Sequence, residues 1–315
     1  MNHTIIPQFD IALAADMCVD LVLKGNVRPQ FQQVEQLVKE YSLEIGGSAN
    51  IFASQMAKLG ARVCVIGYVG LDLFGDFLLH RLRETSVGTG LVRCDPAVRT
   101  GLGVSLTEQN DRAILTFLGG IAAVGPADLP SSPKALTRHW HVASFFLMER
   151  LRPVWKTFLT QCRSAGVTVS FDSNWDPQMR WEGVHDLLPS VDVFLPNEQE
   201  ALAISGEPNP IAAGRALSKL GPLVVVKRGE KGAIAIRGDR HWESLPERPV
   251  AVADTIGAGD NFDAGFVCGW LSGSKIEDCL ALAHRCAAAS LAAAGGIEGQ
   301  LRKSCFASGA MVPKE

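Results

Sequence analysis

The order of segments along the 315-residue chain predicts an α/β fold, in which a mostly parallel, doubly wound sheet is flanked by helices on both faces. Apolar segments suited to buried strands alternate with helical segments over most of the chain. A few extended segments interrupt this alternation and predict a small separate sheet. Ligands of doubly wound sheets bind at the carboxyl ends of the strands, so we expect the site there.

The amino-terminal part contains the first strands and one helix. The segment 9–23 (FDIALAADMCVDLVL) predicts a buried strand that continues into a second extended piece. The segment 45–70 predicts a turn, a helix and an apolar strand, because Phe52, Met56 and Leu59 recur at helical spacing. The segment 45–70 is therefore expected to form one α/β unit.

Two segments break the alternation. Residues 24–44 are rich in Gln, Lys and Glu, and residues 99–120 predict a hairpin with a polar turn at 109–111. A two-stranded hairpin alone is only marginally stable. We therefore expect it to join a partner sheet, which is typical of a lid over a site.

The part of the chain after Trp140 alternates regularly between strand and helix, which favours the parallel sheet. Its predicted elements are a strand at 140–146, a helix at 152–165, a strand at 167–172, a loop at 173–181, a helix near 183–189, a strand at 191–196, helices at 197–206 and near 211–220, a hairpin at 223–236, a strand at 249–254, a helix from 261 and an alanine-rich helix at 276–296.

Composition argues against several classes of function. The formal net charge is -3, with 30 basic and 33 acidic residues and no basic run, so we do not expect a nucleic-acid partner. The eight cysteines lack the spacing of a zinc site or a disulfide framework, and we interpret them as reduced core residues. No segment resembles a signal peptide or a membrane span, which predicts a soluble, cytoplasmic protein without a membrane partner.

The stretch 254–266 (DTIGAGDNFDAGF) predicts an anion site at the start of a helix. Unpaired amides and the helix dipole both favour negative charge there, so Gly257, Ala258 and Gly259 would form the site. Asp260 beside it is placed to take a proton from a hydroxyl during phosphoryl transfer. The alternative is a glycine-containing turn in which Asp260 only caps the helix.

Two further segments suit a nucleotide, although the chain has no GxxxxGK[ST] phosphate loop. The segment VVVKRGEKGA places Gly229 and Gly232 at the end of a strand, and PNEQE places Asn197 and Glu200 on one helix face. A tight hairpin turn and a capped helix start are the structural alternatives. The appearance of both segments on consecutive strand ends favours function.

Taken together, these motifs resemble those of the ribokinase-like, or PfkB, family of carbohydrate kinases. DTIGAGD matches the DTxGAGD signature of the family, NEQE matches its NxxE motif, and KRGEKGA matches its nucleotide-edge segment. The stretch GGSANIFASQMAKLGARVCVIGYVGLDLFGDFL matches its amino-terminal signature. The matches run from residue 9 to residue 296, which implies a single ribokinase-like domain over residues 1–315.

The resemblance implies a kinase that uses ATP and Mg²⁺ and transfers the γ-phosphate to a hydroxyl, usually a primary one, of a sugar or related molecule. Asp260 matches the catalytic base of the family, and the preceding glycine turn matches its anion hole. Asn197 and Glu200 match the pair that organises Mg²⁺ and phosphate, largely through water. Lys227, Gly229 and Gly232 match the segment along the nucleotide, with Thr255 nearby. Asp254 and Ile256 lie at a candidate K⁺ site.

For the acceptor, the resemblance implies that Asp20 binds sugar hydroxyls together with Gly46, Gly47 and Asn50 of a GGxxxN element. Asp16 is a further candidate ligand. An acid and an amide side by side suit a polyol, because they accept from and donate to adjacent hydroxyls. Strand-end and helix-cap positions are the structural alternative for Asp20 and Asn50.

Departures from ribokinase change the expected substrate. Cys18 and Ser48 stand where ribokinase has Asn and Lys, which argues against ribose. FDSNWDPQMRW resembles the DxNxR pattern of fructokinase-like and 2-keto-3-deoxygluconate-kinase-like members, and we expect one of these activities. Arg180 suits a carboxylate or phosphate on the acceptor or, alternatively, is a surface arginine. A nucleoside kinase of the same fold and a non-catalytic sugar-binding regulator are the alternative functions.

In this family the small sheet forms a lid, and in many members two lids pack into a homodimer. Segments 17–23, 41–45 and 99–118 match the lid strands in position. Asp263, inside the helix that follows the anion site, is interpreted as a satisfied helix residue rather than as a second base.

Overall fold

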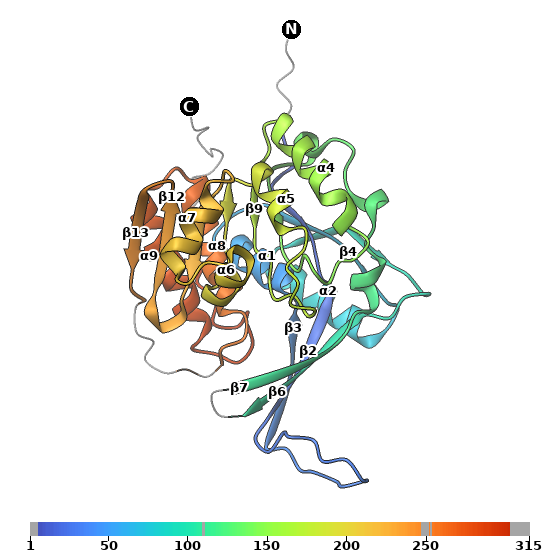
Figure 1. Cartoon of the computed structure of the whole chain (residues 1–315). Helices are drawn as coiled ribbons and strands as arrows, with labels where there is room; N and C mark the ends of the chain where they lie inside the picture. Colours follow the sequence, from blue (N-terminus) through green and yellow to red (C-terminus); the bar gives the residue numbers. More distant parts are fainter. Residues whose placement is uncertain (1–5, 109–110, 247–251, 253, 303–315) are drawn as a thin grey trace.

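The computed structural model describes residues 6–108, 111–246, 252 and 254–302 and confirms the predicted α/β architecture (Figure 1). Its large sheet has nine strands in the order β13-β12-β11-β10-β9-β8-β1-β4-β5. All neighbouring pairs from β5 to β11 are parallel, whereas β12 and β13 join antiparallel. The strands are β1 (Phe9–Ala14), β4 (Val63–Val69), β5 (Gly88–Cys94), β8 (Thr137–Val142), β9 (Thr168–Phe171), β10 (Val193–Phe194), β11 (Leu223–Lys227), β12 (Ala233–Arg237) and β13 (Arg240–Ser244).

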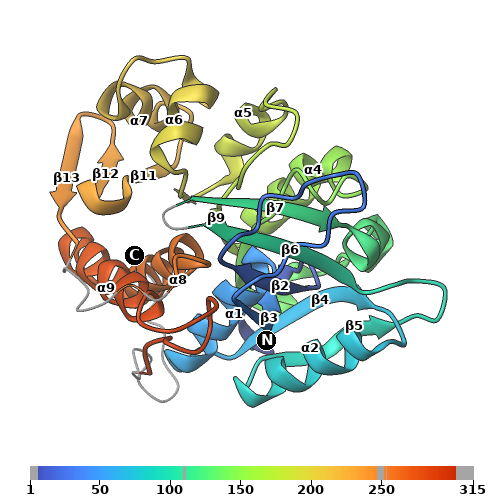
Figure 2. The same ribbon diagram turned by 90° about the horizontal axis from the view of Figure 1, so that it is seen from below.

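Helices bury both faces of this sheet, so the protein has two hydrophobic cores (Figures 1 and 2). Alternate residues of β1 divide between them: Ile11 and Leu13 enter one core, and Ala12 and Ala14 enter the other. The first core includes α1 (Ser48–Lys58), α2 (Leu73–Glu84), α8 (Ala258–Leu271) and α9 (Ile276–Ser290), and the second includes α4 (Arg152–Ser164), α5 (Val184–Leu187), α6 (Glu198–Ser205) and α7 (Pro210–Ser218). A short helix, α3 (Pro133–Leu136), precedes β8, and short 3-10 helices lie at Gly119–Ala123, Pro126–Asp128, Leu188–Ser190 and Gly229–Lys231.

A second sheet of four strands extends from the large sheet, in the order β3-β2-β6-β7 (Figure 1). The strands are β2 (Cys18–Lys24), β3 (Glu40–Gly46), β6 (Gly101–Glu108) and β7 (Asp111–Phe117). The predicted hairpin is therefore present, and its partner is β2, which pairs with β6 in parallel. Two residues of the predicted polar turn, 109–110, lie outside the described residues.

Some elements differ from the prediction. The strand at 140–146 ends at Val142, because Ser144 has a φ of 51° and its hydroxyl turns to Asp16. Helix α2 and strands β5 and β13 were not predicted as elements. The strand predicted at 249–254 lies mostly outside the described residues.

None of the helices in the described part of the chain has the length and apolar character needed to cross a bilayer. The same part of the chain holds no cluster of three or more His, Cys, Asp and Glu side chains suited to a resident metal ion.

Candidate active site

The start of α8 is an open, glycine-lined helix end. Gly257 precedes the helix with a φ of 71°, a conformation that favours glycine, and within the described residues no side chain caps the first amides. Asn261 braces the turn by donating to the carbonyls of Gly257 and Gly296, each at 2.8 Å, and Gln300 donates to Asn261 at 2.9 Å. The uncapped amides and the helix dipole make this end suitable for an anion.

Asp260 lies in the first turn of α8 and is partly exposed. The Ser48 side chain, at the start of α1, lies near the Asp260 carboxyl and acts to lower its pKa. The pKa of Asp260 is raised to about 7, first by the loss of water around the carboxyl and then by Asp172, whereas Lys227 lowers it. A carboxyl with this pKa exchanges its proton near neutral pH, which suits a general base.

Asn197 and Glu200 cap α6 reciprocally. The Asn197 side chain accepts from the Glu200 amide at 2.9 Å, and the Glu200 carboxylate accepts from the Asn197 amide at 2.9 Å. The capped helix start weighed as the structural alternative is therefore present. Glu200 is nevertheless buried, and its pKa is raised to about 7 by burial and by Asp172, with Asp260 adding to the effect. Its carboxyl thus belongs to the same electrostatic cluster as Asp260.

Asp20 on β2 faces a space that two glycines leave open. A methyl group on Gly46 would lie 2.5 Å from Asp20 Oδ1, and one on Gly103 would overlap the same oxygen. The cross-strand register places all three residues on one face of the small sheet. The pKa of Asp20 is raised to about 6 by burial and by Asp16. Sequence reasoning named Gly46 but missed Gly103, whose role depends on strand pairing.

Asp16 and Asn50 have structural roles at the start of α1. Asp16 accepts from the amides of Ser48 and Ala49 at 3.1 and 3.0 Å and from the Ser144 hydroxyl. Its pKa is raised because it is buried. Asn50 donates to Gly46 O at 2.8 Å, while its own side-chain oxygen is buried without a hydrogen-bond partner in the described chain. Asp16 is therefore a helix cap beneath the acceptor region, and a direct contact with sugar stays a prediction.

The turn between α1 and the small sheet depends on Gly47. Its φ of 85° favours glycine, and a methyl group there would overlap the Asp16 carbonyl. Gly47 therefore allows the close approach of β3 and α1 to the segment that follows β1. This fit accounts for the glycine at position 47, and its contact with a sugar stays a prediction.

Lys227, predicted along the nucleotide, belongs to a buried ionic cluster. Its ammonium lies 2.8 Å from Asp172 Oδ2 and 2.8 Å from Asp263 Oδ2, and its side chain is only 12% exposed. Two buried carboxylates hold this side chain near the start of α8, and its contact with a nucleotide stays a prediction. Asp263 is a helix residue as expected, but it is part of this ionic cluster. Apart from the acid in FDSN, no local pattern indicated this cluster.

The other predicted nucleotide residues lie at the turn after β11 and before α8. Gly229 and Gly232 have φ values of 56° and 86°, so the β11–β12 turn is built on left-handed glycines. A methyl group on Gly229 would meet nothing within 4 Å, whereas one on Gly232 would overlap the Ser244 carbonyl. Thr255 is exposed. Their contact with a nucleotide stays a prediction.

Arg180 lies at the surface of the loop after β9. Its side chain is 57% exposed and its ionic contact is with Glu182 at 3.9 Å, while Gln178 accepts a hydrogen bond from its guanidinium. This placement agrees with the surface arginine weighed as the alternative.

The Asp254 carboxylate is buried and organises the turn before α8. It accepts from the amide of Ile256 at 3.0 Å and from the amide of Gly295 at 3.2 Å, and the Lys24 ammonium lies 3.9 Å away. Because this charge is already engaged, a cation at this turn would rely mainly on backbone carbonyls.

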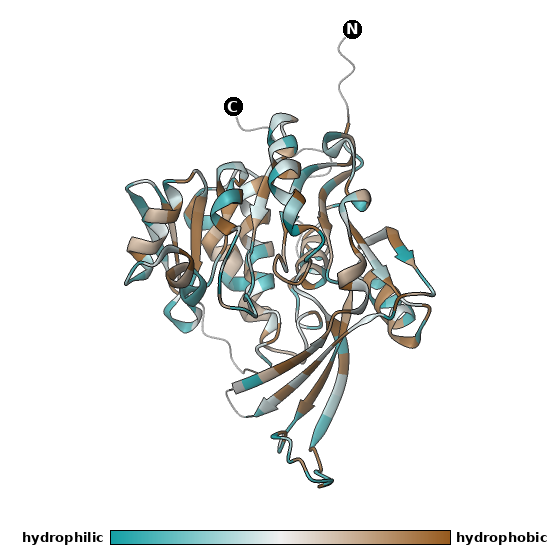
Figure 3. Cartoon of the chain, turned by 45° about the vertical axis from the view of Figure 1, so that its right-hand side comes forward, coloured by the Kyte–Doolittle hydropathy of each residue, from teal (hydrophilic) through white to brown (hydrophobic). Residues whose placement is uncertain are grey.

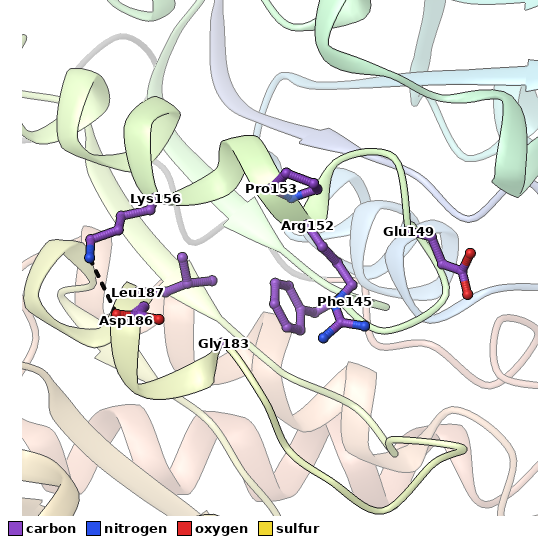
Figure 4. Close-up of a pocket in the computed structure, with 8 residues that line it drawn as sticks. All are labelled: Phe145, Glu149, Arg152, Pro153, Lys156, Gly183, Asp186 and Leu187. Carbon is purple, nitrogen blue, oxygen red and sulfur yellow. Dashed lines mark hydrogen bonds and ion pairs between the residues drawn. The ribbon is translucent and has the colours of Figure 1, made fainter.

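A separate cavity of about 520 Å³ lies beside α4 and α5 (Figure 4). Arg152 reaches over the ring of Phe145 there, and Lys156 pairs with Asp186 at 3.2 Å. The lining contains none of the predicted site residues, so this hollow does not compete with the α8 site as the candidate active site.

Comparison with known proteins supports the family resemblance that the sequence motifs indicated. The model of the pfkB family carbohydrate kinases matches residues 10–303. A fructokinase of Klebsiella pneumoniae is 34% identical over 272 residues, which are 80% of this chain and 87% of that protein. A fructoselysine 6-kinase of Shigella flexneri is 29% identical over 89% of this chain and 97% of its own length. For a 2-dehydro-3-deoxygluconokinase of Bacillus subtilis the values are 27%, 86% and 88%.

Solved structures share the fold. A putative ribokinase II from E. coli, in complex with ATP and Mg²⁺, superposes with a TM-score of 0.81 at 23% identity, over 93% of this chain and 96% of its own. A Vibrio cholerae fructokinase double mutant, in its fructose-, ADP- and potassium-bound form, gives a TM-score of 0.77 at 23% identity, over 92% and 94% of the two chains.

Proposed function

The chain belongs to the pfkB family of carbohydrate kinases and is a sugar kinase, and from this premise we propose that it transfers the γ-phosphate of ATP to a primary hydroxyl of a ketose or a keto sugar acid. One observation carries the proposal: Asp260, with a pKa raised to about 7, stands beside the uncapped amides that begin α8. A base and an anion site in contact are what phosphoryl transfer to a hydroxyl requires.

The residues of this chain then have distinct roles. Asp260 takes the proton of the attacking hydroxyl, and the amides of Gly257, Ala258 and Gly259 hold the charge of the phosphoryl group. ATP and Mg²⁺ supply the transferred group and neutralise its charge when bound. Glu200 and Asn197 suit the Mg²⁺ side, because Glu200 is a buried carboxyl in the same cluster as Asp260. Thr255 and the left-handed Gly229 and Gly232 suit the nucleotide edge.

The acceptor is proposed to bind between the small sheet and α1. Asp20, in the space left by Gly46, accepts sugar hydroxyls, and Gly47 and Asn50 shape the adjoining turn. The relatives named fructokinase, fructoselysine 6-kinase and 2-dehydro-3-deoxygluconokinase support a ketose or keto-acid acceptor. Asp16 supports this wall as a helix cap. A direct role for Arg180 would need its loop to turn inward.

A panel of acceptors tests this assignment. Fructose, 2-dehydro-3-deoxygluconate, ribose and cytidine would each be mixed with Mg-ATP, and ADP release and product mass would be measured. We expect the keto compounds to be phosphorylated fastest, whereas exclusive use of the nucleoside would favour the nucleoside-kinase alternative. Asp260→Asn should abolish turnover while ATP still binds by calorimetry, and Asp186→Asn, which changes an exposed side chain, should match the wild type. A normal rate in Asp260→Asn would disprove its role as base.

We further propose that K⁺ raises the rate by binding to carbonyls around Asp254 and Ile256. The potassium-bound Vibrio cholerae fructokinase of the same fold supports this proposal. Rates would be compared in K⁺ and Na⁺ at equal ionic strength. A severalfold preference for K⁺ is expected, and equal rates would exclude the site.

The small sheet is proposed to act as a lid and to pair two copies of the chain. Its face opposite Asp20 is apolar from edge to edge, since Leu43, Leu21, Val104 and Leu115 align in one cross-strand row. Figure 3 shows apolar residues, in brown, along the strands of this sheet. Leu115 is 62% exposed in the single chain, and exposed apolar faces of this kind mark interaction sites. Light scattering should give a dimer, and Leu115→Lys should give a monomer. A monomeric wild type would refute the pairing.

The dependence on ATP supports a cytoplasmic location, which stays a proposal.

A further inference from the structure

A buried ionic cluster joins three elements beneath the start of α8. Lys227 ends β11, Asp172 directly follows β9, and Asp263 lies in α8. The ammonium of Lys227 is 2.8 Å from one oxygen of each carboxyl group, and the exposed fractions of the Asp172 and Asp263 side chains are 3% and 1%. The ammonium therefore connects two parallel strand ends to the helix that carries Asp260.

The charges of the cluster balance only with Lys227 in place. Burial raises the pKa of Asp263 well above its usual range, with Lys227 opposing and Asp172 adding to the effect. Of the two carboxyl groups, we therefore assign a proton to that of Asp263. Burial also acts to raise the pKa of Asp172, but Lys227 and the hydrogen bonds to this carboxylate together outweigh burial and hold that pKa below its usual value. An ionised Asp172, a protonated Asp263 and a charged Lys227 sum to zero. Without the ammonium, the Asp172 charge would be buried and unpaired.

The cluster reaches Asp260 by two routes. Along the helix, Asp263 lies one turn after Asp260. Through the loop after β9, Asp172 accepts from the backbone amide of Asn174 at 3.0 Å, and the Asn174 side chain donates to the Ser48 hydroxyl at 3.0 Å. Ser48 in turn acts on the Asp260 carboxyl and lowers its pKa. Both the backbone and the carboxyl of Asp260 are thus linked to the same ammonium.

The ammonium also lies close to the first turn of α8. A methyl group placed on Gly259 would have Lys227 Nζ as its nearest neighbour, at 3.7 Å. The first turn of α8 therefore rests on the cluster, and the position of the amides depends on it.

We propose that Lys227 is a positioning residue for phosphoryl transfer: clamped by Asp172 and Asp263, it fixes the first turn of α8 and, through Asn174 and Ser48, the orientation of Asp260. This inference rests on the proposed role of Asp260 as base. Positioning of this kind affects turnover more than binding, because the reacting groups must be held in line.

The test compares Lys227→Met with Lys156→Met, which removes an exposed lysine that is also paired with an aspartate at 3.2 Å. We expect Lys227→Met to lower kcat by about 100-fold, the scale that small misplacements cost, with KM for ATP and sugar within threefold of wild type. The acid limb of kcat/KM should also move to higher pH, because a positive charge near Asp260 is lost. The other charged groups that face Asp260, namely Asp172, Glu200 and Asp16, are retained. Lys156→Met should change neither value.

Two further variants keep the test decisive if Lys227→Met fails to fold. Lys227→Met combined with Asp172→Asn leaves no unpaired buried charge, so it should fold and still show the low kcat. Asp263→Asn replaces a protonated carboxyl with a neutral amide and should lose less than fivefold. A folded Lys227 variant with kcat within threefold of wild type and an unmoved acid limb would overturn the proposal. Asp260→Asn separately tests the base, so the two failures are distinguishable.

Discussion

Gly259→Ala is expected to separate stability from activity. Gly259 is the second residue of α8, it is exposed, and its backbone lies outside the left-handed region, so alanine is compatible with its conformation. A methyl group there would meet only Lys227 Nζ, at 3.7 Å, an ordinary contact distance. Replacing glycine by alanine in a helix stabilises it by about 0.5–1 kcal/mol. For a chain of 315 residues this corresponds to a rise in Tm of roughly 1 °C.

The same methyl group would occupy the space in which the amides of α8 meet a phosphoryl group. Alanine keeps its own amide, but its methyl group would hold a phosphoryl group away from the neighbouring amides. If the contact with one donor is lost, kcat should fall by about 100- to 1,000-fold while Tm holds or rises. Thermal denaturation and an ADP-release assay measure the two effects on one preparation. Gly257→Ala is the contrast: its φ of 71° and a 2.9 Å approach to Gly296 predict loss of stability as well. A Gly259→Ala enzyme with normal kcat would refute the anion site.

Three further predictions concern the acceptor wall, the base and the core. Gly46→Ala places a methyl group 2.5 Å from Asp20 Oδ1 and should raise KM for the sugar at least tenfold with KM for ATP unchanged. Gly90→Ala, whose methyl group would have nothing within 4 Å, should leave both KM values unchanged. A Gly46→Ala enzyme with the wild-type KM for the sugar would contradict the acceptor site. The pKa of about 7 for Asp260 predicts that kcat/KM falls about tenfold per pH unit below neutrality, and a limb near pH 4 would argue against this base. Burial lowers the pKa of His141 to about 3, below its value in the unfolded chain. The stabilisation from the neutral side chain is therefore fully present above about pH 6.5, and the free energy of unfolding falls by up to about 1.4 kcal/mol per pH unit toward pH 3. His141→Gln should flatten this loss in urea titrations.

Local patterns in the sequence accounted for much of the fold. The periodicity of apolar residues shows which side of a helix or strand is buried. It can therefore be read from the sequence even when the element that packs against that side is not known. Glycines at turns, such as Gly257, carry a backbone requirement that is also local. The buried strand β1 and the hairpin of the small sheet followed from the same patterns. Helix α2 and strand β13 did not, because their partly exposed residues give a weak signal.

The contents of the site depended on tertiary structure. The sequence located the DTIGAGD turn, Asp260 and the NxxE pair, since each motif lies within a few residues. It did not show that Lys227 lies 2.8 Å from acids 55 and 36 positions away, nor that Gly103 makes room for Asp20. Pairing of charges depends on distance in space, and the sheet order brings β9, β11 and α8 together only after folding. The sequence therefore determined the class of chemistry, and the tertiary structure decided which charges support it.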